Sequence, residues 1–93
     1  MRFVFKSHLP MSDPTTKEIV KESIETIVDE YGIKSKIDRI FIVLEQKNNQ
    51  LKTRICFHGA YNIKVDSVAL TSISSLDDAL DKVEQKILSL IHI

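Results

Sequence analysis

Hydrophobic positions recur along the chain with a period that changes, and each change marks a predicted element. In the segment 2–6, Phe3 and Phe5 alternate with Arg2, Val4 and Lys6, which predicts a half-buried strand. From Asp13 to Glu30 the apolar spacing becomes three and four residues, which predicts an amphipathic helix. Its apolar stripe consists of Val20, Ile24, Ile27 and Tyr31, widened by Ile19 and Val28.

The predicted first helix carries signals for both of its ends. Ser12-Asp13-Pro14 offers an acceptor side chain followed by proline, which suits a first turn. Thr15 with Glu18 offers an alternative capping box. Gly32 lies just beyond the stripe, where a glycine commonly terminates a helix.

Two strands joined by a turn are predicted next. Arg39–Lys47 is rich in β-branched residues, and Ile40, Ile42 and Leu44 share one face. Asn48-Asn49 then has the composition of a turn. Leu51–His58 alternates again and supplies the third strand.

A fourth strand and a second helix complete the predicted order. After the Gly59-Ala60 turn, apolar residues continue the buried face as far as Ser67. Beyond Ser67 they shift to Val68 and Leu70, which predicts a bulge or the end of pairing. Helical spacing returns from Ile73 to Leu90, with Thr71 or Ser72 as the expected cap. That stripe consists of Ile73, Leu76, Leu80, Val83, Ile87 and Leu90.

This order predicts an α+β fold, β-α-β-β-β-α, with a four-stranded mixed sheet. A strand–helix–strand unit joins parallel neighbours, so the first two strands should be parallel and the two hairpins antiparallel. Both helices should pack on one face and leave the other face open. On that open face we expect Arg2, Lys6, Arg39, Phe41, Glu45, Lys47, Lys52, Arg54, His58 and Lys64.

Charge is sorted by segment although the formal net charge is zero. Residues 34–64 carry seven basic and two acidic side chains, a net of +5. The predicted helical stretches 13–30 and 66–86 carry −4 and −3, and Arg2 and Lys6 restore the balance. The sequence therefore predicts a basic sheet backed by acidic helices, which determines where an anionic partner would bind.

Composition narrows the class of protein. Ninety-three residues are enough for one domain, which we assign to 1–93. The single cysteine, Cys56, has no partner for an internal disulfide, which fits a reducing cytosol. Met1–His8 lacks the long apolar core of a secretory signal or a membrane span, so we expect a cytoplasmic protein without membrane contact. The apolar residues of Ser89–Ile93 are expected to dock rather than form a solvated tail.

Catalytic and cofactor chemistry is not indicated. The two glycines belong to no phosphate-binding loop, and three histidines lie on three different elements without paired ligand spacing. Cys56 and His58 share a strand face, but a small residue beside a polar one is the simpler reading. Asp77 and Asp81 form an ordinary solvated pair one helical turn apart. We predict no enzyme, no metal and no cofactor.

The basic sheet is the remaining candidate site, and two readings stay open. Lysine and arginine supply the salt-dependent part of nucleic-acid affinity, and Phe41 is placed to stack a base. Exposed strands also carry basic residues simply to stay soluble and to discourage edge pairing.

Three segments carry a likeness to a known family: Thr16–Ile24, Phe41–Lys47 and Leu76–Ile87. They resemble the ribosome hibernation promoting factors and ribosome-associated inhibitors, also called sigma-factor modulation proteins. The last segment is similar to the family pattern Ile-Asp-x-x-x-Asp-Lys-Leu-Glu-x-x-Leu. The resemblance covers nearly the whole chain and implies the β-α-β-β-β-α fold. It also implies a bacterial cytosolic stress-response protein that binds the small ribosomal subunit and its RNA, in the channel for messenger and transfer RNA, and blocks translation.

The resemblance and the basic sheet together give the predicted nucleic-acid-binding residues. Lys82 and Lys86 fall at or near basic positions of the matching helix, and Lys36 or Arg39 matches the basic residue entering the second strand. The full set is Lys36, Arg39, Lys47, Lys52, Arg54, Lys64, Lys82 and Lys86.

Departures from the family pattern favour alternatives. Thr71-Ser72-Ile73 replaces an Asp-x-Tyr motif, the C-terminus is apolar rather than basic, and the helices are acidic. Either the sheet side binds RNA, or the chain is a protein-interaction module that dimerises through a sheet edge or the apolar C-terminus. A double-stranded RNA-binding domain ranks third, because serines stand where its last helix carries lysines.

Overall fold

The computed structural model describes residues 2–7, 14–69 and 72–91; side chains 7, 14–16, 46–47, 72–75 and 91 are left aside. The predicted caps Ser12, Asp13 and Thr71 lie outside the described residues, as do residues 92–93, and the side chains of the alternative caps Thr15 and Ser72 are not described. The elements are β1 (Arg2–Ser7), α1 (Pro14–Glu30), a 3-10 turn η1 (Lys34–Lys36), β2 (Ile37–Lys47), β3 (Gln50–Gly59), β4 (Ile63–Ala69) and α2 (Ser72–Ile91).

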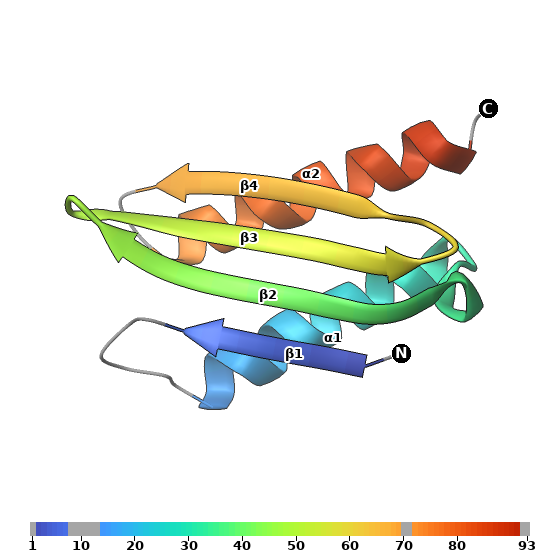
Figure 1. Cartoon of the computed structure of the whole chain (residues 1–93), viewed down its shortest axis with the longest axis horizontal. Coiled ribbons are helices and arrows are strands. Elements are labelled where there is room, and N and C mark those ends of the chain that lie inside the picture. The colour runs from blue at the N-terminus through green and yellow to red at the C-terminus, as the bar shows by residue number, and fades with distance from the viewer. Residues whose placement is uncertain (1, 8–13, 70–71, 92–93) are drawn as a thin grey trace.

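The predicted α+β architecture is confirmed. The sheet has the order β1-β2-β3-β4, with β1 parallel to β2 and the other neighbours antiparallel. Both helices lie on one face, α1 toward the β1 side and α2 toward the β4 side (Figure 1). Neither of the two described helices lies on the opposite face of the sheet (Figure 1).

Local sequence explains how α1 ends. Gly32 has φ +66°, a left-handed conformation that glycine adopts without a side-chain penalty. The Gly32 N–H donates to the Asp29 carbonyl at 3.2 Å, and the Ile33 N–H donates to the Val28 carbonyl at 3.0 Å. This is a Schellman motif, and its two flanking apolar residues, Ile33 and Val28, are both buried. Gly32 therefore terminates α1 as predicted.

The turn between β2 and β3 also follows from its residues. Lys47 pairs with Gln50, so only Asn48 and Asn49 connect the strands. Both asparagines have positive φ, +53° and +63°, which matches the twist that a two-residue hairpin requires. Asparagine tolerates this region better than most residues with a side chain.

The core lies between the sheet and the two helices. It contains inward residues of β2, β3 and β4 and most of the predicted apolar positions of α1 and α2, with Phe3 and Phe5 of β1 packed at its margin. Ile19, predicted to widen the stripe of α1, is instead 59% exposed. The least exposed members, at 0%, are Ile24, Val28, Ile40, Ile42, Ile55, Ala79 and Val83. Leu90 packs against this core near the end of α2, in keeping with the expected docking of that region.

One expectation about β4 is wrong. The shift of apolar positions after Ser67 predicted a bulge or the end of pairing, yet β4 continues in register until Ala69 pairs with Leu51. Ser67 lies on the buried face of the sheet and is 2% exposed, whereas Val68 lies on the opposite face and is 54% exposed. The Ser67 hydroxyl donates to Asp78 Oδ2 at 2.7 Å, so its polarity is satisfied beneath α2.

Candidate nucleic-acid interface

Strand alternation gathers positive charge on the sheet face away from the helices. We call this the open face; its described side chains are Arg2, Val4, Lys6, Arg39, Phe41, Val43, Glu45, Lys52, Arg54, Cys56, His58, Lys64, Asp66 and Val68. Six of these are basic (Arg or Lys) and two are acidic, so the open face carries a net charge of +4. The predicted position of the basic residues is thereby confirmed for the described side chains.

Cross-strand register arranges the open face in rows. The first row consists of two arginines and a histidine, and the second row is mostly apolar. The third row again contains basic side chains. In order from β1 outward the rows are Arg2, Arg39 and His58; Val4, Phe41, Cys56 and Lys64; and Lys6, Val43, Arg54 and Asp66. Cations thus flank an apolar strip that includes one aromatic ring, an arrangement suited to phosphates on the outside and a base within.

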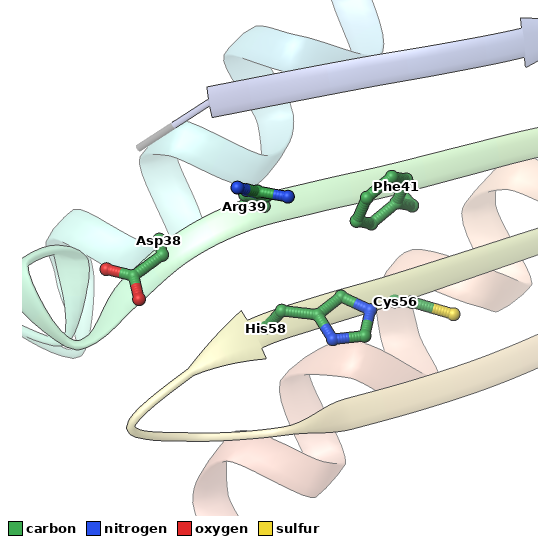
Figure 2. Close-up of a pocket in the computed structure, with 5 residues that line it drawn as sticks. All are labelled: Asp38, Arg39, Phe41, Cys56 and His58. Carbon is green, nitrogen blue, oxygen red and sulfur yellow. The ribbon is translucent and has the colours of Figure 1, made fainter.

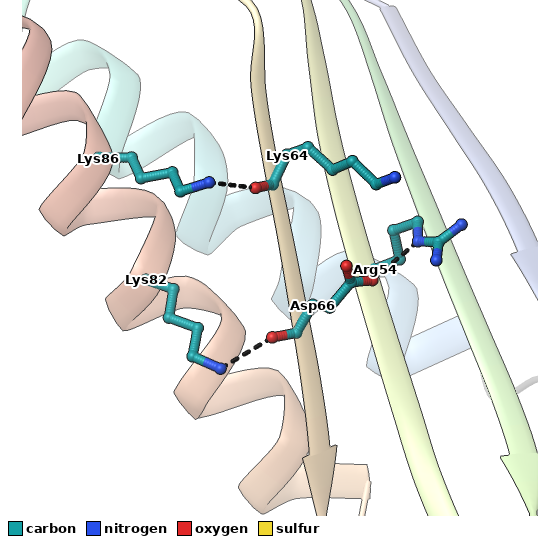
Figure 3. Close-up of polar contacts among 5 residues, drawn as sticks. All are labelled: Arg54, Lys64, Asp66, Lys82 and Lys86. Carbon is teal, nitrogen blue, oxygen red and sulfur yellow. Dashed lines mark hydrogen bonds and ion pairs between the residues drawn. The ribbon is translucent and has the colours of Figure 1, made fainter.

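Arg54 is partly neutralised by its neighbour on β4. Its Nε donates to Asp66 Oδ1 at 2.8 Å (Figure 3). This hydrogen bond lowers the pKa of Asp66 below its usual value and raises the pKa of Arg54. Asp66 therefore stays ionised into the acid range, and Arg54 has one of its donors committed within the protein.

Lys64 and Lys52 complete the open face on β4 and β3. Neither ammonium takes part in an ion pair within the described part of the chain. Figure 3 shows the Lys64 side chain extending over the sheet on the same side as Arg54. Lys52 lies opposite Glu45 of β2. These two lysines are therefore available to an external anion.

Lys82 and Lys86, predicted as binding residues from the last helix, lie elsewhere. The Lys82 Nζ donates to the Asp66 carbonyl at 2.8 Å and lies 3.1 Å from Asp78 Oδ2. The Lys86 Nζ donates to the Lys64 carbonyl at 2.5 Å (Figure 3). Both side chains thus occupy backbone acceptors of the edge strand β4. They flank the open face instead of forming part of it.

The remaining predicted residues lie near the two ends of the sheet. Lys36 is exposed in η1, and its carbonyl accepts a hydrogen bond from the Ala60 N–H at 2.9 Å. Lys47 ends β2, and its side chain lies outside the described set. The structure therefore brings together Arg39, Lys52, Arg54 and Lys64 of the predicted set, and adds Arg2 and Lys6.

A shallow pocket lies at the end of the open face where β2 begins and β3 ends (Figure 2). It is lined by Asp38, Arg39, Phe41, Cys56 and His58, and its volume is about 720 Å³. The Phe41 and His58 rings are 5.2 Å apart at an interplanar angle of 88°. Asp38 was not predicted to lie on the open face, because strict alternation along a strand assigns it to the opposite face from Arg39.

Acidic side chains concentrate on the helical side. Glu18, Glu22, Asp29 and Glu30 of α1 are exposed, as are Asp77, Asp78 and Asp81 of α2. The Lys21 ammonium lies 5.7 Å from the centroid of the Phe3 ring, so this cation of α1 is directed toward β1. The molecule therefore has a basic sheet face and an acidic helix face.

The described residues contain no group of three or more His, Cys, Asp or Glu side chains that could hold an ion. None of the helices in the described part of the chain is long and apolar enough to cross a membrane. Cys56 is a half-buried free thiol beside His58.

Comparison with known proteins identifies the fold. No protein-family model matches the chain, and no curated protein matches it. A ribosomal subunit interface protein from Coxiella burnetii superposes with a TM-score of 0.86 at 12% identity, covering 100% of both chains. The N-terminal domain of Thermus thermophilus Protein Y superposes with a TM-score of 0.69 at 13% identity, covering 92% of this chain and 91% of that one. The chain shares their fold, as the resemblance implied.

Proposed function

We propose that this chain is a ribosome-associated translation inhibitor of the hibernation type, which binds RNA of the small ribosomal subunit through its open face. The observation that carries the proposal is the positive charge of a sheet face that no described helix covers: +4 from the alternating strand positions, and +3 when Asp38 of the pocket is included. The shared fold with a ribosomal subunit interface protein supports the choice of partner.

The charge distribution sets the orientation of the proposed complex. Phosphates repel the acidic helix face and attract the open face, so the sheet faces the RNA. Arg2, Lys6, Arg39, Lys52 and Lys64 make no ion pair within the described residues and are the proposed phosphate contacts. Five such contacts to single-stranded RNA give a slope of about −3.5 in log affinity against log salt.

Co-sedimentation with ribosomes tests the proposal. We expect the protein to travel with ribosomal particles from stationary-phase extract at low salt and to be released as salt rises. The variant Lys52→Glu/Lys64→Glu reverses two open-face charges without touching a described ion pair, and should remain at the top of the gradient.

A control changes the same net charge on the helical side. Lys17→Glu/Lys34→Glu alters α1 and the turn after it. The described ion pair that this variant removes, between Lys34 and Asp29, is long at 4.0 Å and exposed, so its loss should affect stability little. This control should still co-sediment. Wild-type protein that stays at the top of the gradient even at low salt would refute the proposal.

A second candidate function is a protein-interaction module. Its motivation is the acidic helix face, on which Ile19 of α1 is a single apolar side chain, 59% exposed. The β4 edge is a poor dimer interface, because Lys82 and Lys86 occupy two of its carbonyls. Sedimentation equilibrium checks this alternative, and a strict monomer at high concentration would remove homodimerisation.

A further inference from the structure

An irregularity at the start of β2 brings two consecutive side chains to one pocket. Neighbouring residues of a strand normally point to opposite faces. The register between β2 and β3 shifts between Ile37 and Arg39, so Asp38 has no partner on β3. Asp38 and Arg39 consequently both line the pocket (Figure 2). Bulges commonly re-aim side chains beside functional sites.

Gly59 holds this bulge in place from the opposite strand. Ile37 pairs with Gly59, and a Cβ added there would lie 2.5 Å from the Lys36 carbonyl oxygen and 2.9 Å from the Asp38 nitrogen. The Ala60 N–H donates to that same Lys36 carbonyl at 2.9 Å. The close approach of the two backbones is therefore built into the chain, and it holds the backbone at Asp38 in the bulged register.

The pocket combines an aromatic ring with two exposed charged side chains. Phe41 is half-buried in the pocket lining, and its edge-to-face contact with His58 favours one ring orientation. Asp38 and Arg39 are exposed, and neither takes part in an ion pair within the described residues. A carboxylate, a guanidinium and an aromatic ring thus line one pocket that is open to solvent, with Asp38 and Phe41 toward its two ends (Figure 2).

We infer that this pocket binds an unstacked guanine base of single-stranded RNA. The base stacks on the Phe41 ring, the Asp38 carboxylate accepts hydrogen bonds from the base edge, and Arg39 contacts the adjoining phosphate. The inference rests on the proposed function, because it names the element of RNA that the open face reads.

The choice of guanine follows from the chemistry of Asp38. An ionised carboxylate only accepts hydrogen bonds. Guanine presents two adjacent donors on its Watson–Crick edge, N1–H and N2–H, which a carboxylate takes in bidentate fashion. Adenine and cytosine each place an acceptor beside their amino group, and uracil flanks its single donor with two acceptors. Those acceptors repel the carboxylate, so the other three bases bind more weakly.

Mononucleotide titration followed by ¹⁵N–¹H NMR tests the inference without ribosomes. GMP should shift the backbone amides of Arg39, Phe41, Cys56 and His58. Its affinity should exceed that of AMP, CMP and UMP by about fivefold or more, the lower limit for one bidentate contact. Equal affinity for all four nucleotides, shifts elsewhere, or no shifts would overturn the inference.

Two variants separate stacking from base reading. Phe41→Leu keeps an apolar side chain and should weaken binding of all four nucleotides. Asp38→Ala removes the carboxylate and should abolish the preference for GMP while retaining weak stacking. Retained preference in Asp38→Ala would overturn the assigned role. Thermal unfolding of each variant confirms that it is folded.

The same variants distinguish this inference from the proposed function. Asp38→Ala should still co-sediment with ribosomal particles, because it leaves the proposed phosphate contacts intact. Ribosome binding without any nucleotide preference would support the proposed function and refute the guanine pocket. A preference for GMP without ribosome binding would support the guanine pocket and refute the proposed function.

Discussion

The two glycines give a matched pair for testing how the bulge is held. Gly59→Ala adds a Cβ that would lie 2.5 Å from the Lys36 oxygen and 3.1 Å from the Ile37 Cα. These are backbone atoms of η1 and of the start of β2, so relief requires the backbone there to move away from β3. Gly59 also has φ +154°, a value that residues with a side chain rarely adopt.

The expected magnitude follows from those two costs. Overpacking against rigid atoms costs about 1–3 kcal/mol, and an unfavourable backbone conformation costs about 1–3 kcal/mol more. Part of each is relieved when the strands shift, so we expect Gly59→Ala to lower the free energy of unfolding by about 2–4 kcal/mol. Gly32→Ala is the control, because φ is +66° but nothing lies within 4 Å of the added Cβ. It should cost about 1–2 kcal/mol.

Urea denaturation of wild type and both variants measures these differences. The midpoint should fall further for Gly59→Ala than for Gly32→Ala, with similar slopes if the transitions stay two-state. The amide resonances of Asp38 and Arg39 should also shift in Gly59→Ala. Equal losses in the two variants would refute the argument, because they would show that the contact with the opposite strand contributes nothing.

Three further predictions concern the open face and the core. Lys52→Glu/Lys64→Glu should reduce the steepness of the salt dependence of RNA affinity by about 1.4, measured by fluorescence anisotropy; an unchanged slope would place the contacts elsewhere. Asp66→Asn should be less stable than wild type at neutral pH. The hydrogen bond from Arg54 lowers the pKa of Asp66 in the folded state. The stability that this hydrogen bond supplies is therefore present above the pKa of Asp66 in the unfolded chain, near 3.8, and is lost as the pH falls through the lower pKa of the folded state. Urea midpoints across pH should therefore converge in acid, and a constant gap would contradict this. Ile55→Ala should cost about 2–5 kcal/mol in urea unfolding, since Ile55 is fully buried in a central strand, and a loss below that range would show that the core collapses around the site.

Element order was predictable because each segment keeps one period. The stripes of α1 and α2 and the alternation of β3 depend only on spacing along the chain, so the core could be read from the sequence. The end of α1 was equally local, because Gly32 needs only its own backbone freedom. The placement of basic residues on the open face followed directly from strand alternation.

Features that need two elements at once were not predictable. Asp38 reaches the pocket because Gly59 permits a close approach from the neighbouring strand. Ser67 is tolerated in the core because its hydroxyl donates a hydrogen bond to the Asp78 carboxylate of α2. The binding role of the basic residues, including Lys36 and Lys47, stays a prediction.

The protection of β4 by Lys82 and Lys86 has a consequence for partial unfolding. Two acceptors of that strand are covered by side chains that belong to α2, not to the sheet. Undocking of the C-terminal helix therefore uncovers both acceptors together, along with the apolar surface beneath. Self-association of this protein should begin from that opened form, at a rate set by how often the helix detaches.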